Sequence, residues 1–84
     1  MQVKPYRVVH SVENETATRC VDIVVWSDGQ FGFQEWRREP EDPGNWWLLS
    51  EGGGMRHSSK TDAEAAARAS VPWFGALGGP RVQA

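Results

Sequence analysis

The stretch DIVVWSDGQFGFQEWRRE (residues 22–39) joins two strand-like apolar runs through an Asp-Gly pair. Asp-Gly between such runs is a strong short-range signal for a β-hairpin closed by a two-residue turn. A turn at Asp28-Gly29 places Ser27 opposite Gln30 and sets the pairing of every residue further out. The sequence therefore predicts two adjacent antiparallel strands, and this register decides which side chains share a face.

Both faces of the predicted hairpin are apolar, because strand side chains alternate between the two sides of a sheet. In this register one face carries Val24, Trp26, Phe31 and Phe33, and the other carries Val21, Ile23, Val25 and Trp36. A short helix rich in alanine packs best on bulky sheet residues, so we assign the first set to the core. The second set is then an uncovered apolar face.

The rest of the chain extends the hairpin into a meander followed by a helix. Residues 6–12 and 46–50 have strand-like composition, residues 40–45 supply a turn, and the glycines at 52–54 begin a flexible link. Thr61 and Glu64 have the spacing of a capping box, and Val71-Pro72 ends the helix that follows. We expect an α+β fold: a three- or four-stranded antiparallel β-meander with one C-terminal α-helix packed on one face.

The chain's 84 residues are sufficient for a single small domain. We expect an ordered core over residues 5–74 and a flexible tail over residues 75–84. The formal net charge is −2, and no apolar run approaches the length of a membrane span. A single cysteine, Cys20, is typical of a reducing compartment, so we expect a cytoplasmic protein.

The uncovered apolar face is the main functional clue, since such a patch marks an interaction site or an aggregation hazard. Three coverings are open: a second copy of the chain, the C-terminal tail, or a different protein partner. We favour self-association as a homodimer by a non-enzymatic interaction module. The expected surface consists of Val21, Ile23, Val25 and Trp36, with Trp47 as an extension.

Catalytic and metal-binding patterns are weak in this sequence. Cys20 is predicted opposite Arg37, which would favour a thiolate, but a lone strand cysteine is more often a small hydrophobe. His10, Cys20 and His57 lack the spacing of zinc motifs. Asp22 and Glu35, predicted as cross-strand neighbours, are better explained by neutralisation by nearby arginines. We therefore expect no enzyme activity, cofactor or metal.

Binding of single-stranded nucleic acid is the alternative function. Arg19, Arg37 and Arg38 are predicted to converge beside Trp36, and sheets that present aromatic and arginine side chains stack unpaired bases. The surrounding acidic residues and the overall acidity weigh against this reading, because phosphate binding depends on net positive charge. Nucleic acid is thus a possible partner that we do not favour.

The order SDGQFGF, WWLLSEGG and SSKTDAEAAARASV (residues 27–33, 46–53 and 58–71) resembles short bacterial proteins of the YegP-like kind. The likeness spans residues 21–71 and implies an antiparallel meander followed by one helix, in a protein from a bacterium. This chain lacks the tandem duplication of YegP-like proteins, and its link after Ser50 is longer. The resemblance supplies no catalytic residues to carry over.

Overall fold

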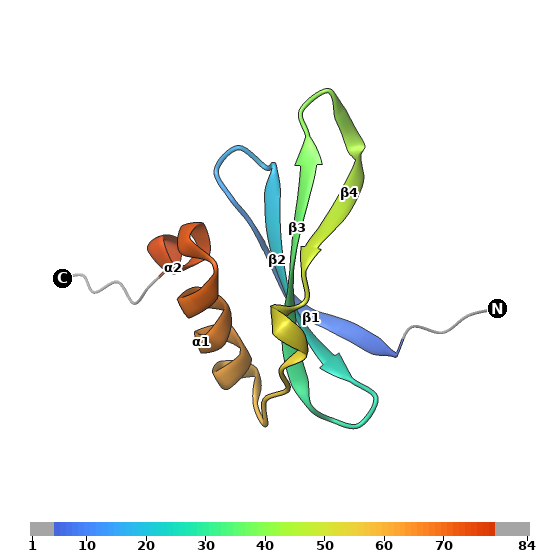
Figure 1. The fold of residues 1–84 in the computed structure, drawn as a ribbon, viewed down its shortest axis with the longest axis vertical. Coiled ribbons are helices and arrows are strands. Elements are labelled where there is room, and N and C mark those ends of the chain that lie inside the picture. Colours follow the sequence, from blue (N-terminus) through green and yellow to red (C-terminus); the bar gives the residue numbers. More distant parts are fainter. Residues whose placement is uncertain (1–4, 79–84) are drawn as a thin grey trace.

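The computed structural model describes residues 5–78 and has two layers, a four-stranded antiparallel sheet and a pair of helices on one of its faces (Figure 1). The strands follow the order β1-β2-β3-β4, so each pairs with its neighbour in sequence. This confirms the predicted α+β meander, with four strands. The elements are β1 (Tyr6–Glu13), β2 (Arg19–Trp26), β3 (Phe31–Glu39), β4 (Asp42–Ser50), the 3₁₀ turn η1 (Gly52–Gly54), α1 (Lys60–Ser70) and α2 (Pro72–Gly78).

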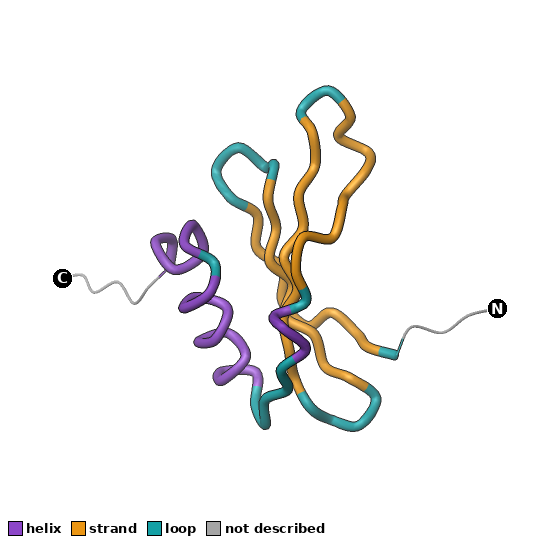
Figure 2. The backbone as a smooth tube through the Cα atoms, viewed as in Figure 1, coloured by secondary structure: helices purple, strands orange, loops and turns teal. Residues whose placement is uncertain are grey.

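The hairpin between β2 and β3 closes with three loop residues instead of two (Figure 2). The Gly29 N–H donates to the Trp26 carbonyl at 2.9 Å, and the Trp26 N–H donates to the Gln30 carbonyl at 2.7 Å. Gly29 has a φ of +88°, the conformation that the last residue of such a loop requires. The predicted turn position is correct, but the predicted register is wrong by one residue, because Val25 and not Trp26 pairs with Phe31.

The shifted register exchanges the partners of the two faces. Ile23 pairs with Phe33, and both are buried together with Val21 under Ala63 and Ala67 of α1. The assignment of Val24 and Trp26 to the helix-covered core is therefore wrong. Alternation places their side chains on the opposite side of β2, although Val24 is also fully buried.

Helix α1 begins one turn earlier than the capping-box prediction. The Ser59 hydroxyl accepts from the Asp62 N–H at 3.0 Å, so Ser59 is the N-cap in place of Thr61. Glu64 instead forms an ion pair with Arg68 at 2.8 Å, one turn along the helix. Small residues line the inner side of α1, which lets the helix lie close to the bulky sheet residues.

The segment after Pro72 is a second helix that belongs to the core. Proline occupies the first position of α2, where the missing N–H costs no hydrogen bond. Phe74 is 1% exposed and completes the cluster below α1. The tail predicted for residues 75–84 is therefore wrong for residues 75–78, while residues 79–84 lie outside the described part.

Two connections also differ from expectation. The β3–β4 turn consists of Pro40 and Glu41, since Glu39 pairs with Asp42, and Pro43-Gly44 lies within β4 on a bulged edge. The glycine run 52–54 forms η1 with positive φ at each residue, and a side chain at Gly52 would meet the Phe33 ring at 2.9 Å. The expected flexible link is thus a defined turn that lies against the core.

Candidate functional site

The sheet face opposite α1 and α2, here called the open face, is the largest uncovered surface with mixed aromatic and polar character. Strand pairing and alternation define its members. Its apolar part includes Val8 and Leu48, each 43% exposed. The side chains of this face are Tyr6, Val8, Ser11, Glu13, Cys20, Asp22, Val24, Trp26, Gln34, Trp36, Arg38, Trp46 and Leu48.

Near the β2–β3 loop the open face carries an aromatic cluster held by an arginine. The Arg56 guanidinium lies 4.1 Å from the ring centre of Trp26 and forms an ion pair with Asp28 at 3.3 Å. Tyr6 meets the other side of the cluster in an edge-to-face contact with Trp26, with ring centres 5.0 Å apart. These contacts occupy the Trp26 ring and restrict its use as a stacking platform.

A second arginine lies against Trp46 near the other end of the sheet. The Arg38 guanidinium is 4.4 Å from the Trp46 ring centre. Its N–H groups donate to the carbonyl oxygens of Ala17 at 2.7 Å and Pro43 at 2.9 Å. Arg38 therefore ties two hairpin loops together and has a structural role.

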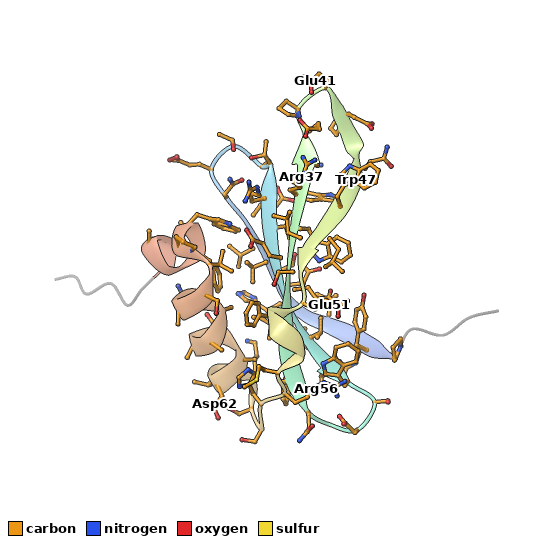
Figure 3. All side chains as sticks on the ribbon, in the orientation of Figure 1. Arg37, Glu41, Trp47, Glu51, Arg56 and Asp62 are labelled. Carbon is orange, nitrogen blue, oxygen red and sulfur yellow. The ribbon has the colours of Figure 1, made fainter. Side chains whose placement is uncertain are left out.

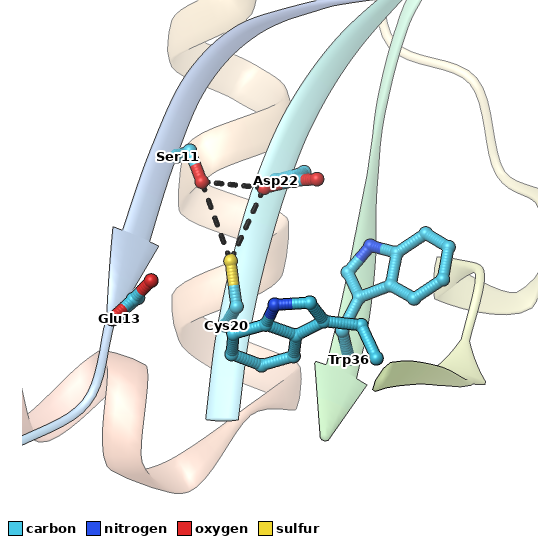
Figure 4. Close-up of a pocket in the computed structure, with 6 residues that line it drawn as sticks. Ser11, Glu13, Cys20, Asp22 and Trp36 are labelled. Carbon is cyan, nitrogen blue, oxygen red and sulfur yellow. Dashed lines mark hydrogen bonds between the residues drawn. The ribbon is translucent and has the colours of Figure 1, made fainter. Parts of the chain in front are cut away.

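Beside Trp46, the open face contains a pocket of about 300 Å³ to which all four strands contribute (Figure 4). It is lined by Ser11 and Glu13 of β1, Cys20 and Asp22 of β2, Trp36 of β3 and Trp46 of β4.

The polar wall of this pocket is a hydrogen-bonded triangle. The Ser11 hydroxyl donates to Oδ1 of Asp22 at 2.7 Å, and the Cys20 thiol donates to the same oxygen at 3.3 Å. The Ser11 oxygen and the Cys20 sulfur are themselves 3.3 Å apart. Both contacts use Oδ1, so Oδ2 of Asp22 is left without a hydrogen bond from any described residue.

The Cys20 thiol in this triangle is poorly suited to nucleophilic chemistry. Burial, followed by the neighbouring Asp22 and Glu13 carboxylates, raises its pKa from 9.0 to about 11, although the Ser11 hydrogen bond opposes this shift. The predicted pairing of Cys20 with Arg37 is wrong, since Cys20 pairs with Trp36. The arrangement favours the protonated thiol and supports the interpretation of Cys20 as a small, buried hydrophobe.

A further exposed apolar surface lies on β4, the outer strand of the sheet beyond β3. Trp47, Leu48 and Leu49 follow one another and are 54%, 43% and 45% exposed. Figure 3 shows Trp47 on this strand, remote from both helices. This surface, here called the β4 edge, combines exposed apolar side chains with the unpaired outer backbone groups of an edge strand.

The predicted interaction surface is only partly exposed. Val21 and Ile23 are fully buried in the core, and Val25 is half-buried on the same side of β2, so the prediction that these three form an uncovered face is wrong. The one-residue register shift is the cause. Trp36 does lie on the face opposite the helices, half-buried, and Trp47 is exposed.

The residues predicted to bind nucleic acid are divided between the two faces. Arg19 lies on the helix side with Glu35, at 3.3 Å, and Arg37 forms an ion pair with Glu39. Trp36 and Arg38 lie on the open face, so the predicted cluster does not form.

The predicted carboxylate pair is divided in the same way. Asp22 pairs across the strands with Gln34 on the open face. Glu35 instead accepts from the Trp73 indole N–H at 3.1 Å on the helix side. Among residues 5–78, no cluster of three His, Cys, Asp or Glu side chains could hold a metal ion.

Sequence reasoning missed Ser11, Glu13 and Trp46 as neighbours in one pocket. Their proximity depends on the pairing of β1 with β2 and of β4 with β3, and each of these ladders contains a bulge. Bulges displace the register by a residue without a clear sequence signal, so only the strand pairing of the folded chain reveals the pocket.

Comparison with protein-family models, with curated proteins and with solved structures finds no match to this chain. The resemblance to YegP-like domains thus remains an expectation from the sequence. No helix within residues 5–78 is both long enough and apolar enough to cross a membrane.

Proposed function

We propose that the protein is a non-enzymatic interaction module that forms a homodimer by pairing the β4 edges of two copies. The observation that carries this proposal is the run of three consecutive exposed apolar residues, Trp47, Leu48 and Leu49, on an outer strand. The single cysteine of the sequence supports a cytoplasmic setting for this module.

The composition of the β4 edge supports strand pairing. Natural proteins protect exposed edge strands with charged residues, prolines or covering segments. Residues 46–50, WWLLS, contain neither charge nor proline. An edge of this kind would favour aggregation unless it has a defined partner, and a second copy of the same strand is the simplest one.

The sequence of the β4 edge is also self-complementary. In an antiparallel pair around a two-fold axis at Leu48, Trp47 lies opposite Leu49 of the partner, and Leu49 lies opposite Trp47 of the partner. Each cross-strand pair is then apolar, and aromatic–aliphatic pairs of this kind stabilise a sheet by about 0.2–1 kcal/mol each. An isologous contact uses each surface twice, as two-fold dimers require.

Light scattering over a range of protein concentrations tests the proposal. We expect a dimer that dissociates on dilution, and we expect Leu49→Lys to be monomeric at concentrations where the native chain is dimeric. Leu77→Lys is the matched control, because Leu77 is 44% exposed but lies on α2.

Far-UV circular dichroism of both variants verifies that the fold persists. A native chain that is monomeric at every concentration would refute self-association. A dimer that Leu49→Lys weakens no more than Leu77→Lys does would refute the β4 edge as its interface.

A further inference from the structure

We propose that the pocket on the open face binds a small methylated ammonium group. This site is distinct from the proposed dimer edge, since one chain supplies all six lining residues and pairing of the outer edge of β4 leaves the open face uncovered. The volume of about 300 Å³ lies at the lower end of the range of small-molecule sites.

The first argument is the uncompensated negative charge in the pocket. Glu13 and Asp22 both line it, and no basic side chain does. Within the described residues, neither of them takes part in any of the ion pairs, which join Arg19–Glu35, Arg37–Glu39, Arg56–Asp28 and Arg68–Glu64. An occupant with positive charge would supply the missing counter-charge.

The second argument is the aromatic lining. Trp36 and Trp46 provide indole surfaces next to the two carboxylates. The face of an indole attracts cations, and sites that combine aromatic rings in this way recognise quaternary ammonium groups. Arg38 over Trp46 already demonstrates this attraction within the chain, and its bonds to the carbonyls of Ala17 and Pro43 anchor it away from the carboxylates.

The third argument is a set of polar atoms without partners around the pocket. Gln34 is the cross-strand partner of Asp22, is only 2% exposed, and its Oε1 accepts no hydrogen bond from the described residues. The indole N–H of Trp36 is likewise buried without an acceptor among them. A buried unpaired polar group costs about 1–3 kcal/mol, and such groups are often explained by a bound molecule.

Choline is a suitable probe, because it joins a trimethylammonium group to a hydroxyl that can both accept and donate a hydrogen bond. Its neutral isostere, 3,3-dimethylbutan-1-ol, has the same shape without the charge. We expect choline to bind at least about tenfold more tightly than the isostere, since only the cation interacts with the carboxylates and the indole faces.

Nuclear magnetic resonance titration can follow the indole N–H signals of the ¹⁵N-labelled protein. We expect saturable shifts at Trp36 and Trp46. Trp73 is an internal control, because its N–H donates to Glu35 on the other side of the sheet. An unshifted Trp73 signal also shows that the fold is preserved.

Charge-neutral variants test the role of the carboxylates. We expect Asp22→Asn to weaken choline binding by about tenfold and Glu13→Gln by about two- to fivefold, because Glu13 is more exposed and better screened. Glu15→Gln is the matched control, since Glu15 is an exposed acid just beyond β1 that does not line this pocket.

Equal binding of choline and its isostere would overturn the proposal. So would a lack of saturable shifts, or an effect of Glu13→Gln no larger than that of Glu15→Gln. A short peptide with trimethyl-lysine, titrated in parallel, distinguishes the source of the ammonium group. Tighter binding than choline indicates a modified lysine side chain, and weaker or equal binding indicates a free small molecule.

Discussion

Replacement of Phe74 by alanine is the sharpest test of the C-terminal part of the fold. Phe74 is 1% exposed and packs in the cluster formed by β2, β3 and α1, whereas sequence reasoning placed it at the end of the ordered core. Removal of a buried phenylalanine side chain costs about 3–5 kcal/mol through lost burial and the cavity left behind. A domain of this length has a stability of about 4–13 kcal/mol, so the change removes a large share of it.

Close packing of α2 on α1 supports this magnitude. A Cβ at Gly75 would lie 2.5 Å from the carbonyl oxygen of Arg68, so the backbones of the two helices are nearly in contact. The Arg68 guanidinium also lies 4.6 Å from the Phe74 ring centre and donates to the Phe74 carbonyl at 3.2 Å. The surroundings of Phe74 can therefore collapse only slightly when its ring is removed.

Urea unfolding followed by tryptophan fluorescence and circular dichroism measures the effect. We expect the midpoint of Phe74→Ala to fall by the equivalent of about 3–5 kcal/mol, with a similar slope. Leu77→Ala, a change at an exposed position of the same helix, should cost less than about 1 kcal/mol. A loss at Phe74 no greater than the loss at Leu77 would refute the docking of α2.

Two further predictions concern the hairpin loop and the buried thiol. Gly29→Ala should lower the unfolding free energy by about 1 kcal/mol because of the φ of +88°, and urea unfolding should show a clearly smaller effect for Gly44→Ala, where φ is not positive and a Cβ meets no atom within 4 Å. Because folding raises the pKa of Cys20 from 9.0 to about 11, the folded chain holds this proton more tightly than the unfolded chain. The resulting stability is complete below about pH 9 and is lost as the pH rises towards 11, so the unfolding free energy of the native chain should fall across this range more steeply than that of Cys20→Ala. Parallel pH profiles with the same slope would contradict the shifted pKa.

The sequence was sufficient to predict the order of the strands, their antiparallel pairing and the helix after them, because these follow from composition and turn residues. It was not sufficient for the register. Asp28-Gly29 suits both a two-residue turn and the end of a three-residue loop, and the two differ only in whether Ser27 belongs to the loop. One residue of difference moves Phe31 and Phe33 to the other face of the hairpin.

Polar residues decide which face the helices cover. Val21, Ile23 and Val25 give β2 one wholly apolar side, while Asp22 interrupts the other side, and Gln34 lies opposite it on β3. A helix lined with alanine offers no hydrogen-bond partners, so it would leave these polar groups unpaired in a dry interface. The alternation within β2 alone therefore favours the observed side for α1, whatever the register of β3.

The same reasoning explains why a functional site is better sought on the open face than under the helices. On the helix side the carboxylate of Glu35 is paired with Arg19 and Trp73, so its charge is already compensated. On the open face, Asp22 and Glu13 have no basic partner among the described residues, although both adjoin two tryptophans. Folding has thus left its uncompensated charge beside its accessible indole rings, which is the combination that a cationic ligand recognises.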